Sequence, residues 1–248
     1  MRRLVKTSAI CLRVRNWRES SRIVTLLTPD LGLVTAVARG ARRPKSRLAA
    51  ALDLFARSEI TIYLPKTSGL ATLSDAELIT SYPALTANYE RFLIAARLNQ
   101  FLLRALLPNH PEPRLYTLLE TTLTAIAQAP PDCNELSALF SSFLLKAVSF
   151  LGFRPRFDRC TICHQSINSS SAWFIIRRGG LLCPTCLTKE NKPLSQNEGV
   201  ELKTTELEIL KTLLHTPMAQ LTNFTLPVPL RQLINLYAEF HLNIKKII

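Results

Sequence analysis

The 248-residue sequence predicts an α+β multidomain protein: an N-terminal β barrel, then an all-α domain with an inserted four-cysteine module. Three observations support this fold class. Residues 4–79 carry short alternating apolar runs, residues 88–151 carry helical periodicity, and residues 158–191 hold two pairs of cysteines. With 47% apolar and only 20% charged residues, the chain has the composition of a packed globular protein.

The first 81 residues alternate in polarity as half-buried strands do. Because closure removes exposed sheet edges, five strands in so short a segment favour a small closed barrel. An OB-fold is the expected barrel, and an SH3-like barrel is the alternative. The predicted strands are Val5–Arg15, Ser21–Leu27, Leu33–Arg39, Glu59–Leu64 and Leu73–Ile79.

After Pro83 the apolar residues recur at helical spacing. A wide apolar face from Leu136 to Val148 predicts a heavily buried helix. The predicted helices are 88–107, 115–129, 135–151, one that begins with a capping box at Thr205 and Glu208, and 230 to the C-terminus. The predicted domains are an OB-fold nucleic-acid-binding domain at 1–81, a helical domain in two parts at 82–157 and 192–248, and a zinc-binding insertion at 158–191.

Positive charge is concentrated near the N-terminus. The chain has a net charge of +13 and a pI near 9.9, and residues 1–81 alone hold 14 Lys and Arg against 6 Asp and Glu. A block of like charge on a folded surface indicates a polyanionic partner, and nucleic acid is the expected one. The candidate DNA-binding residues are Arg39, Arg42, Arg43, Lys45 and Arg47, with Trp17 as a stacking platform for bases.

This set makes a quantitative prediction. If each of the five cations meets one phosphate of single-stranded DNA, the logarithm of the binding constant should fall with the logarithm of salt concentration with a slope of about −3.5.

The four cysteines Cys160, Cys163, Cys183 and Cys186 form two C-x2-C pairs. Two residues between cysteines let both thiolates of a pair face one tetrahedral ion, so the spacing predicts a closed, structural zinc site. An iron–sulfur centre and disulfides are the alternatives. His164 could substitute as a ligand, but a solvent-facing histidine is favoured.

No catalytic motif stands out in the sequence. It lacks a phosphate-binding P-loop, a nucleophile elbow and an H-E-x-x-H pair, so we predict no enzymatic activity. It also lacks an apolar run long enough for a membrane span and a convincing signal peptide, which makes the cytoplasm the expected location. Two other classes remain open: a zinc-dependent nuclease, and an RNA- or ribosome-associated basic zinc-binding protein.

The run from Gly40 to Arg47 and the cysteine quartet, in this order of parts, resemble the RecO family of bacterial DNA recombination mediators. The resemblance implies an OB-fold, binding of single- and double-stranded DNA, annealing of complementary strands, and loading of the recombinase RecA during DNA gap repair. It implies two protein partners, RecR and the acidic C-terminal tail of single-stranded-DNA-binding protein, and a nucleoid-associated location. Arg42, Arg43, Lys45 and Arg47 fall on the family's basic motif, and the four cysteines on zinc positions found in many members.

Overall fold

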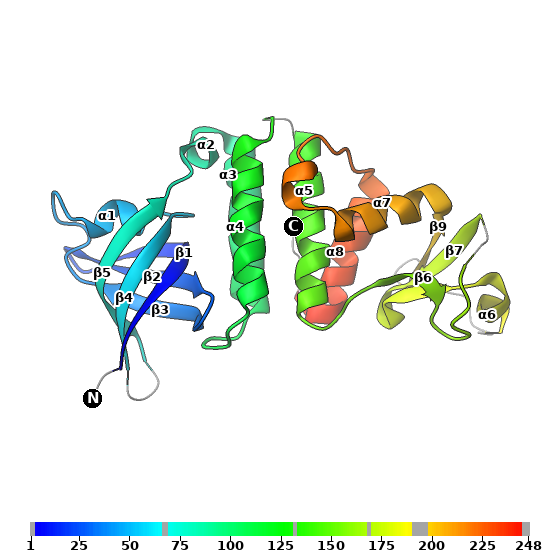
Figure 1. Ribbon diagram of the computed structural model, residues 1–248, viewed down its shortest axis with the longest axis horizontal. Coiled ribbons are helices and arrows are strands. Elements are labelled where there is room, and N and C mark those ends of the chain that lie inside the picture. The colour runs from blue at the N-terminus through cyan, green and yellow to red at the C-terminus, as the bar shows by residue number, and fades with distance from the viewer. Residues whose placement is uncertain (1–2, 66–68, 131–132, 168–169, 190–197, 245–248) are drawn as a thin grey trace. The chain divides into compact units, whose positions relative to one another are not determined.

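The computed structural model describes residues 3–65, 69–130, 133–167, 170–189 and 198–244. The chain divides into two units, Met1–Ala127 and Gln128–Ile248 (Figure 1). The first unit holds a β barrel with the helices that follow it, and the second holds three longer helices and a small sheet. Within the described residues, every helix is too short or too polar to cross a membrane.

Five strands close into a barrel in the order β1-β2-β3-β5-β4, with β4 pairing back to β1. The pair β3–β5 is parallel and the other pairs are antiparallel. All five predicted strands are present, and most extend one to three residues beyond the predicted ends. They are β1 (Arg3–Trp17), β2 (Ser21–Thr28), β3 (Gly32–Ala38), β4 (Arg57–Leu64) and β5 (Ala71–Thr80).

Every second side chain of the strands points into the barrel and fills its interior. Along β4, Ser58, Ile60 and Ile62 are buried while their neighbours are half-buried or exposed, because successive side chains of a strand point to opposite faces. The aliphatic residues of all five strands form one core cluster, which Ala51 and Leu52 close from the segment between β3 and β4. That segment contains the single-turn helix α1 (Leu48–Ala51).

Helices α2 (Pro83–Ala87), α3 (Tyr89–Ala105) and α4 (Pro113–Gln128) complete the first unit. Asn99 on α3 donates to the Leu12 carbonyl at 3.0 Å, and the Tyr116 hydroxyl on α4 donates to Ser8 at 2.9 Å. Arg57 on β4 pairs with Glu120 on α4. These polar contacts fasten both helices to β1 and β4.

A close approach of two backbones makes glycine necessary at the start of β3. Gly32 has a φ of +69°, and a Cβ placed there would lie 2.2 Å from the carbonyl oxygen of His110. The same region contains a parallel bridge between Leu33 and Pro108. The α3–α4 connection therefore packs directly against the barrel.

In the second unit, α5 (Cys133–Phe150) packs against α7 (Thr204–His215) and α8 (Val228–Leu242). Every residue from Leu136 to Val148 is buried, which confirms the predicted burial of this helix. Two polar side chains of α5 bond to carbonyls beyond the helix: Ser142 to Leu213, and Lys146 to Thr216. Burial lowers the pKa of Lys146 to about 8.

A small sheet in the order β6-β8-β7-β9 carries the cysteines, together with helix α6 (Pro184–Thr188). Its strands are β6 (Arg156–Cys160), β7 (Ser171–Ile175), β8 (Gly180–Leu182) and β9 (Gly199–Lys203). Strand β9 pairs with β7 from beyond residue 191, where we placed the end of the insertion; residue 191 itself lies outside the described residues. Residues 245–248 of the predicted last helix also lie outside them.

The predicted capping box at Thr205 and Glu208 is wrong. Helix α7 begins at Thr204, and the backbone N–H of Lys203 donates to the Glu206 carboxylate at 2.9 Å. The strand β9 runs directly into the helix, so the cap lies two residues earlier than the sequence pattern suggested.

Candidate nucleic-acid interface and metal centre

A loop of two successive turns follows β3 and carries the cations from Arg39 to Arg47. Backbone bonds from Arg43 to Gly40 at 3.0 Å and from Ser46 to Arg43 at 3.1 Å shape these turns. Gly40 and Lys45 have left-handed backbones, with φ of +71° and +62°. The side chains of Arg39, Arg42, Arg43, Lys45 and Arg47 are all exposed.

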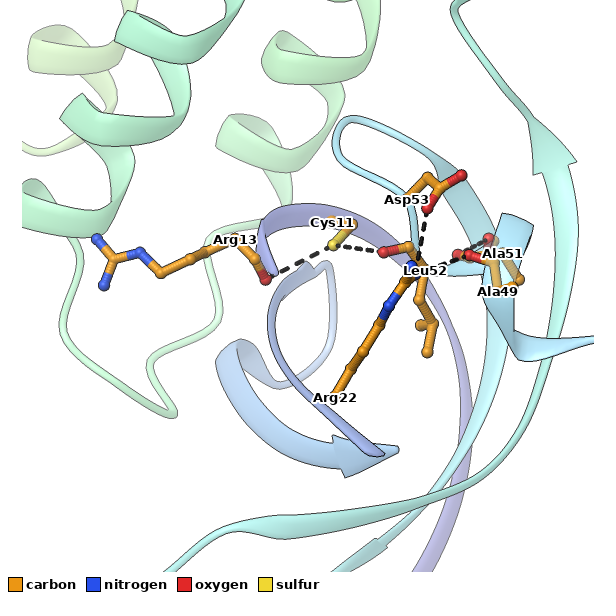
Figure 2. Close-up of polar contacts among 8 residues, drawn as sticks. Cys11, Arg13, Arg22, Ala49, Ala51, Leu52 and Asp53 are labelled. Carbon is orange, nitrogen blue, oxygen red and sulfur yellow. Dashed lines mark hydrogen bonds and ion pairs between the residues drawn. The ribbon is translucent and has the colours of Figure 1, made fainter. Parts of the chain in front are cut away.

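Arginines fix this loop at both ends. At its start, the backbone N–H of Arg42 donates to Ser20 at 2.9 Å and its guanidinium donates to the Arg18 carbonyl at 3.2 Å. Beyond its end, Arg22 on β2 donates to the Ala49 carbonyl and to the Asp53 carboxylate, each at 3.2 Å (Figure 2). The cations are therefore held on a folded surface, and the loop does not behave as a solvated tail.

The loop borders an open groove of about 1150 Å³ on the barrel. Three segments meet there: the β1–β2 turn with Trp17 and Arg18, the β3 exit with Arg39 and Arg43, and the start of β5 with Thr72. The parallel pair β3–β5, in which Val37 faces Thr72, brings the third segment to the first two. The groove thus combines three arginines with an aromatic ring.

Trp17 is 45% exposed at the end of β1. The guanidinium carbon of Arg18 lies 5.9 Å from the centre of its ring, at the outer limit of a cation–π contact. Arg18 has a left-handed backbone with a φ of +53°, which turns the chain sharply after the strand. The ring is therefore accessible from the groove instead of buried in the core.

Of the candidate residues taken from the sequence, Trp17, Arg39 and Arg43 line this groove. Arg42, Lys45 and Arg47 are exposed on the same loop but are absent from the groove lining. Sequence reasoning missed Arg18 and the segment Leu70–Thr72. The signal for Arg18 was its position in the β1–β2 turn beside Trp17, whereas Leu70–Thr72 carry no charge and are brought in only by strand pairing.

The four cysteines come together in the second unit. Their sulfur atoms all lie within 4.8 Å of one another, and the sulfurs of Cys163 and Cys183 are 3.8 Å apart. A tetrahedral ion with metal–sulfur bonds of about 2.3 Å has sulfurs about 3.8 Å apart. His164 is exposed with a φ of +60°, and it does not belong to this cluster.

The pKa values of these thiols indicate how crowded the cluster is. Burial raises the pKa of Cys160, but backbone N–H groups of Cys163, Cys183 and Ile162 outweigh it and lower the pKa to about 6. Burial and the three neighbouring thiols raise the pKa of Cys186 to about 12. One thiolate is thus favoured, while four together repel one another until a cation compensates them, so the donor set fits a soft divalent metal ion.

The apolar packing around the cysteines is small. The cluster of buried residues there consists of Cys160, Ile175, Leu182 and Cys186, and two of these are candidate ligands. The rest of the sheet is held by other apolar contacts, since the buried ring of Phe174 lies 5.5 Å from that of Tyr237 on α8. A metal ion bound by the four cysteines would therefore add a cross-link where the apolar packing is smallest.

Two family descriptions match the chain. The N-terminal part of recombination protein O matches residues 1–82, and its C-terminal part matches residues 86–246. The chain belongs to the recombination protein O family. The resemblance seen in the basic run and the cysteine quartet is confirmed by these matches, which together span almost the whole chain.

Relatives in this family carry the name DNA repair protein RecO. The one from Symbiobacterium thermophilum is 36% identical over 85% of this chain and 80% of its own length. The one from Desulforamulus reducens is 27% identical over 98% of this chain and 91% of its own length. For Desulfitobacterium hafniense, the identity is 31% over 75% of this chain, and the match spans 65% of that relative.

Proposed function

We propose that this protein acts in DNA repair as a recombination mediator that binds single- and double-stranded DNA, anneals complementary strands and helps to load a recombinase onto DNA coated by single-stranded-DNA-binding protein. The observation that carries the proposal is the groove with Trp17, Arg18, Arg39 and Arg43 on the barrel. Membership of the recombination protein O family and the name of its relatives support it.

The barrel is proposed to be an OB-fold. Its closed order β1-β2-β3-β5-β4 supports this assignment, and so does the position of the groove. OB-folds bind oligonucleotides across strands 2 and 3 and between the loops that join strands 1–2 and 4–5. Here the β1–β2 turn, the β3 exit and the segment before β5 border the groove.

Binding in this groove requires no bond chemistry. Arg39 and Arg43, with Arg18, would meet phosphates of a single strand and release its condensed counterions. Trp17 would stack on bases, a contact that tolerates any sequence because every base has a π-face. Arg42, Lys45 and Arg47 would extend the positive surface beside the groove, and the proposed role is not catalytic.

Zinc is the proposed metal, held by Cys160, Cys163, Cys183 and Cys186. Four thiolates at these distances favour it over an iron–sulfur centre. When bound, zinc would supply cross-linking and charge compensation. Cys160 at the end of β6 and Cys186 on α6 would join the two halves of the module, while Cys163 and Cys183 complete the tetrahedron at its surface.

RecR and the acidic tail of single-stranded-DNA-binding protein are the proposed protein partners, and the nucleoid-associated cytoplasm is the proposed location. The domain boundaries at 81, 157 and 191 also remain proposals. The break between the two family matches, at residues 83–85, supports the first of them.

Strand annealing tests the proposed function. Complementary oligonucleotides coated by single-stranded-DNA-binding protein should anneal faster when this protein is added, and a coat protein without its acidic tail should reduce that gain. No acceleration on either coated or bare strands would refute the annealing role. Competition between matched DNA and RNA strands distinguishes the RNA-binding alternative, which predicts that RNA displaces DNA.

A further inference from the structure

We propose a second groove for single-stranded nucleic acid, on the second unit beside the cysteine cluster, built on Arg154 and Arg156. Two hollows of about 690 Å³ and 410 Å³ lie there. Gly152, Arg154 and Arg156 line both hollows, so the two adjoin at these residues, and together they are called the second groove. The inference rests on the proposed DNA-binding function, but it concerns residues that the basic-loop argument never used.

The groove is strongly positive. Its lining contains five cations, Arg154, Arg156, Arg159, Arg178 and Lys211, against the single carboxylate of Asp158. Asp158 lies 3.7 Å from Arg159, and Lys211 pairs with Glu208 at 2.8 Å. Even with these two pairs set aside, Arg154 and Arg156 keep exposed positive charge in the part that the two hollows share. A polyanion is the ligand that this lining attracts.

Hydrogen bonds orient Arg154. Its guanidinium donates to Nε2 of His215 at 2.9 Å, and Nδ1–H of His215 donates to the Lys211 carbonyl at 2.9 Å in the last turn of α7. A guanidinium has five N–H donors, so this single bond leaves most of them for a phosphate. These two hydrogen bonds thus restrict the position of the Arg154 guanidinium without neutralising its charge.

Arg156 is fixed through its backbone. Its N–H donates to the Gly179 carbonyl at 2.8 Å, and it faces Gly180 across the parallel pair β6–β8. A Cβ at Gly180 would lie 3.3 Å from Cβ of Arg156, so the small residue allows this close approach. Arg154 lies two residues before Arg156, ahead of the strand, and both arginines line the two hollows, so they are neighbouring cations there.

An exposed aromatic ring lies beside these cations. Phe153 is 41% exposed, and its ring centre is 5.2 Å from that of His241. The Tyr237 hydroxyl donates to the Phe153 carbonyl at 2.9 Å, so the backbone is held while the ring remains accessible. Alternating cations with an accessible ring is the pattern of single-strand binding, in which the groove follows the backbone and aromatic rings stack on bases. Single-stranded nucleic acid would use both the cations and the ring.

The test uses a background in which the barrel groove is weakened by Arg39→Gln and Arg43→Gln, so that the remaining binding reports the second groove. Adding Arg154→Gln and Arg156→Gln removes two phosphate contacts. The salt slope for a labelled oligothymidine should then fall in magnitude by about 1.4, and affinity at 0.1 M salt should fall by about 25-fold. Lys189→Gln with Lys203→Gln is the matched control, because both lysines are exposed on the same unit and lie outside the groove lining.

Photocrosslinking of iodouracil-containing oligonucleotide to the unaltered protein gives an independent measurement. Mass spectrometry should find the crosslink on the peptide that contains Phe153. The inference is overturned if the Arg154/Arg156 variant matches the lysine control and no crosslink reaches this peptide. It is also overturned if the Arg154/Arg156 variant loses affinity for an acidic peptide but not for the oligonucleotide. Failure of the unaltered protein to bind any DNA would instead refute the proposed function itself.

Discussion

Replacing Arg18, Arg39 and Arg43 with glutamine should weaken single-stranded DNA binding and flatten its salt dependence. These are the three cations that line the barrel groove together with Trp17. Glutamine keeps the length and polarity of most of the side chain, so the loss is mainly one of charge. The bonds that shape the loop, from Arg42 to Ser20 and from Arg22 to Asp53, are untouched by these changes.

The magnitude follows from the number of contacts. Each phosphate neutralised on a single strand contributes about −0.7 to the slope of log K against log salt, so three contacts contribute about −2.1. At 0.1 M salt the same three contacts account for a factor of roughly 100 in affinity. Both quantities can be measured by fluorescence anisotropy with a labelled oligothymidine at several salt concentrations.

The matched control replaces Arg3, Arg13 and Arg15 with glutamine. These residues are also exposed on the barrel unit and carry the same total charge, but they lie outside the groove lining. We expect this control to change the slope by no more than one contact, about 0.7. Equal changes of slope in the two triple variants would refute the groove as the DNA path and would leave only a general attraction to a basic surface. In a separate titration that follows tryptophan fluorescence, Trp17→Phe should remove most of the quenching by DNA. Quenching that survives would assign the signal to Trp173.

Three further predictions concern stability. Cys183→Ser should lower the free energy of unfolding of the second unit by about 4 kcal/mol or more, as loss of a structural metal does, while DNA affinity changes far less. Thermal melts measure the loss of stability, and anisotropy titrations measure the change in DNA affinity. A larger effect on DNA affinity than on stability would indicate direct DNA recognition. Gly32→Ala should cost about 1–3 kcal/mol more than Gly40→Ala in urea unfolding, because the two glycines have the same left-handed φ but only at Gly32 would a Cβ meet backbone, at His110. Equal costs would mean that the His110 segment moves aside. Lys146→Met should remove a pH dependence of stability. The pKa of Lys146 is lowered from 10.5 to about 8, so the unfolded chain binds more protons than the folded one between these pH values. The unaltered protein should therefore gain stability over the variant as pH rises through this range, by less than about 1.4 kcal/mol per pH unit. A stability difference that does not change over this range would contradict the burial of its charge.

The strands of the barrel could be predicted from the sequence because their evidence is local. Alternation in β4 and the Pro29–Gly32 turn between β2 and β3 are both visible within a few residues. The parallel pair β3–β5 was beyond sequence reasoning, because it joins segments more than thirty residues apart that share no motif. That pair determines which residues border the groove, so Thr72 and its neighbours could not be assigned from the sequence.

The cysteine cluster was predictable for a similar reason, because two C-x2-C pairs with fixed internal spacing specify one tetrahedral site. The sheet around it was not, because β9 has only five residues and joins from the far side of the insertion. Lys211 is likewise more than fifty residues from Arg154 and Arg156 in the sequence. Only the packing of α7 against β6 brings Lys211 to the two arginines.

Counting cations therefore cannot identify the DNA surface. Five contacts in the basic loop predict a salt slope of about −3.5, and so do three contacts in the barrel groove with two in the second groove. The total slope of the unaltered protein is the same in both cases, although the paths of the DNA differ. In the first case the Arg154/Arg156 variant keeps the full slope, and in the second it loses about 1.4. A surface with two separate grooves also predicts that one molecule can hold two strands at once. Two measurements thus distinguish the two arrangements: the salt slope of variants with cations replaced in one groove at a time, and the number of strands bound per molecule.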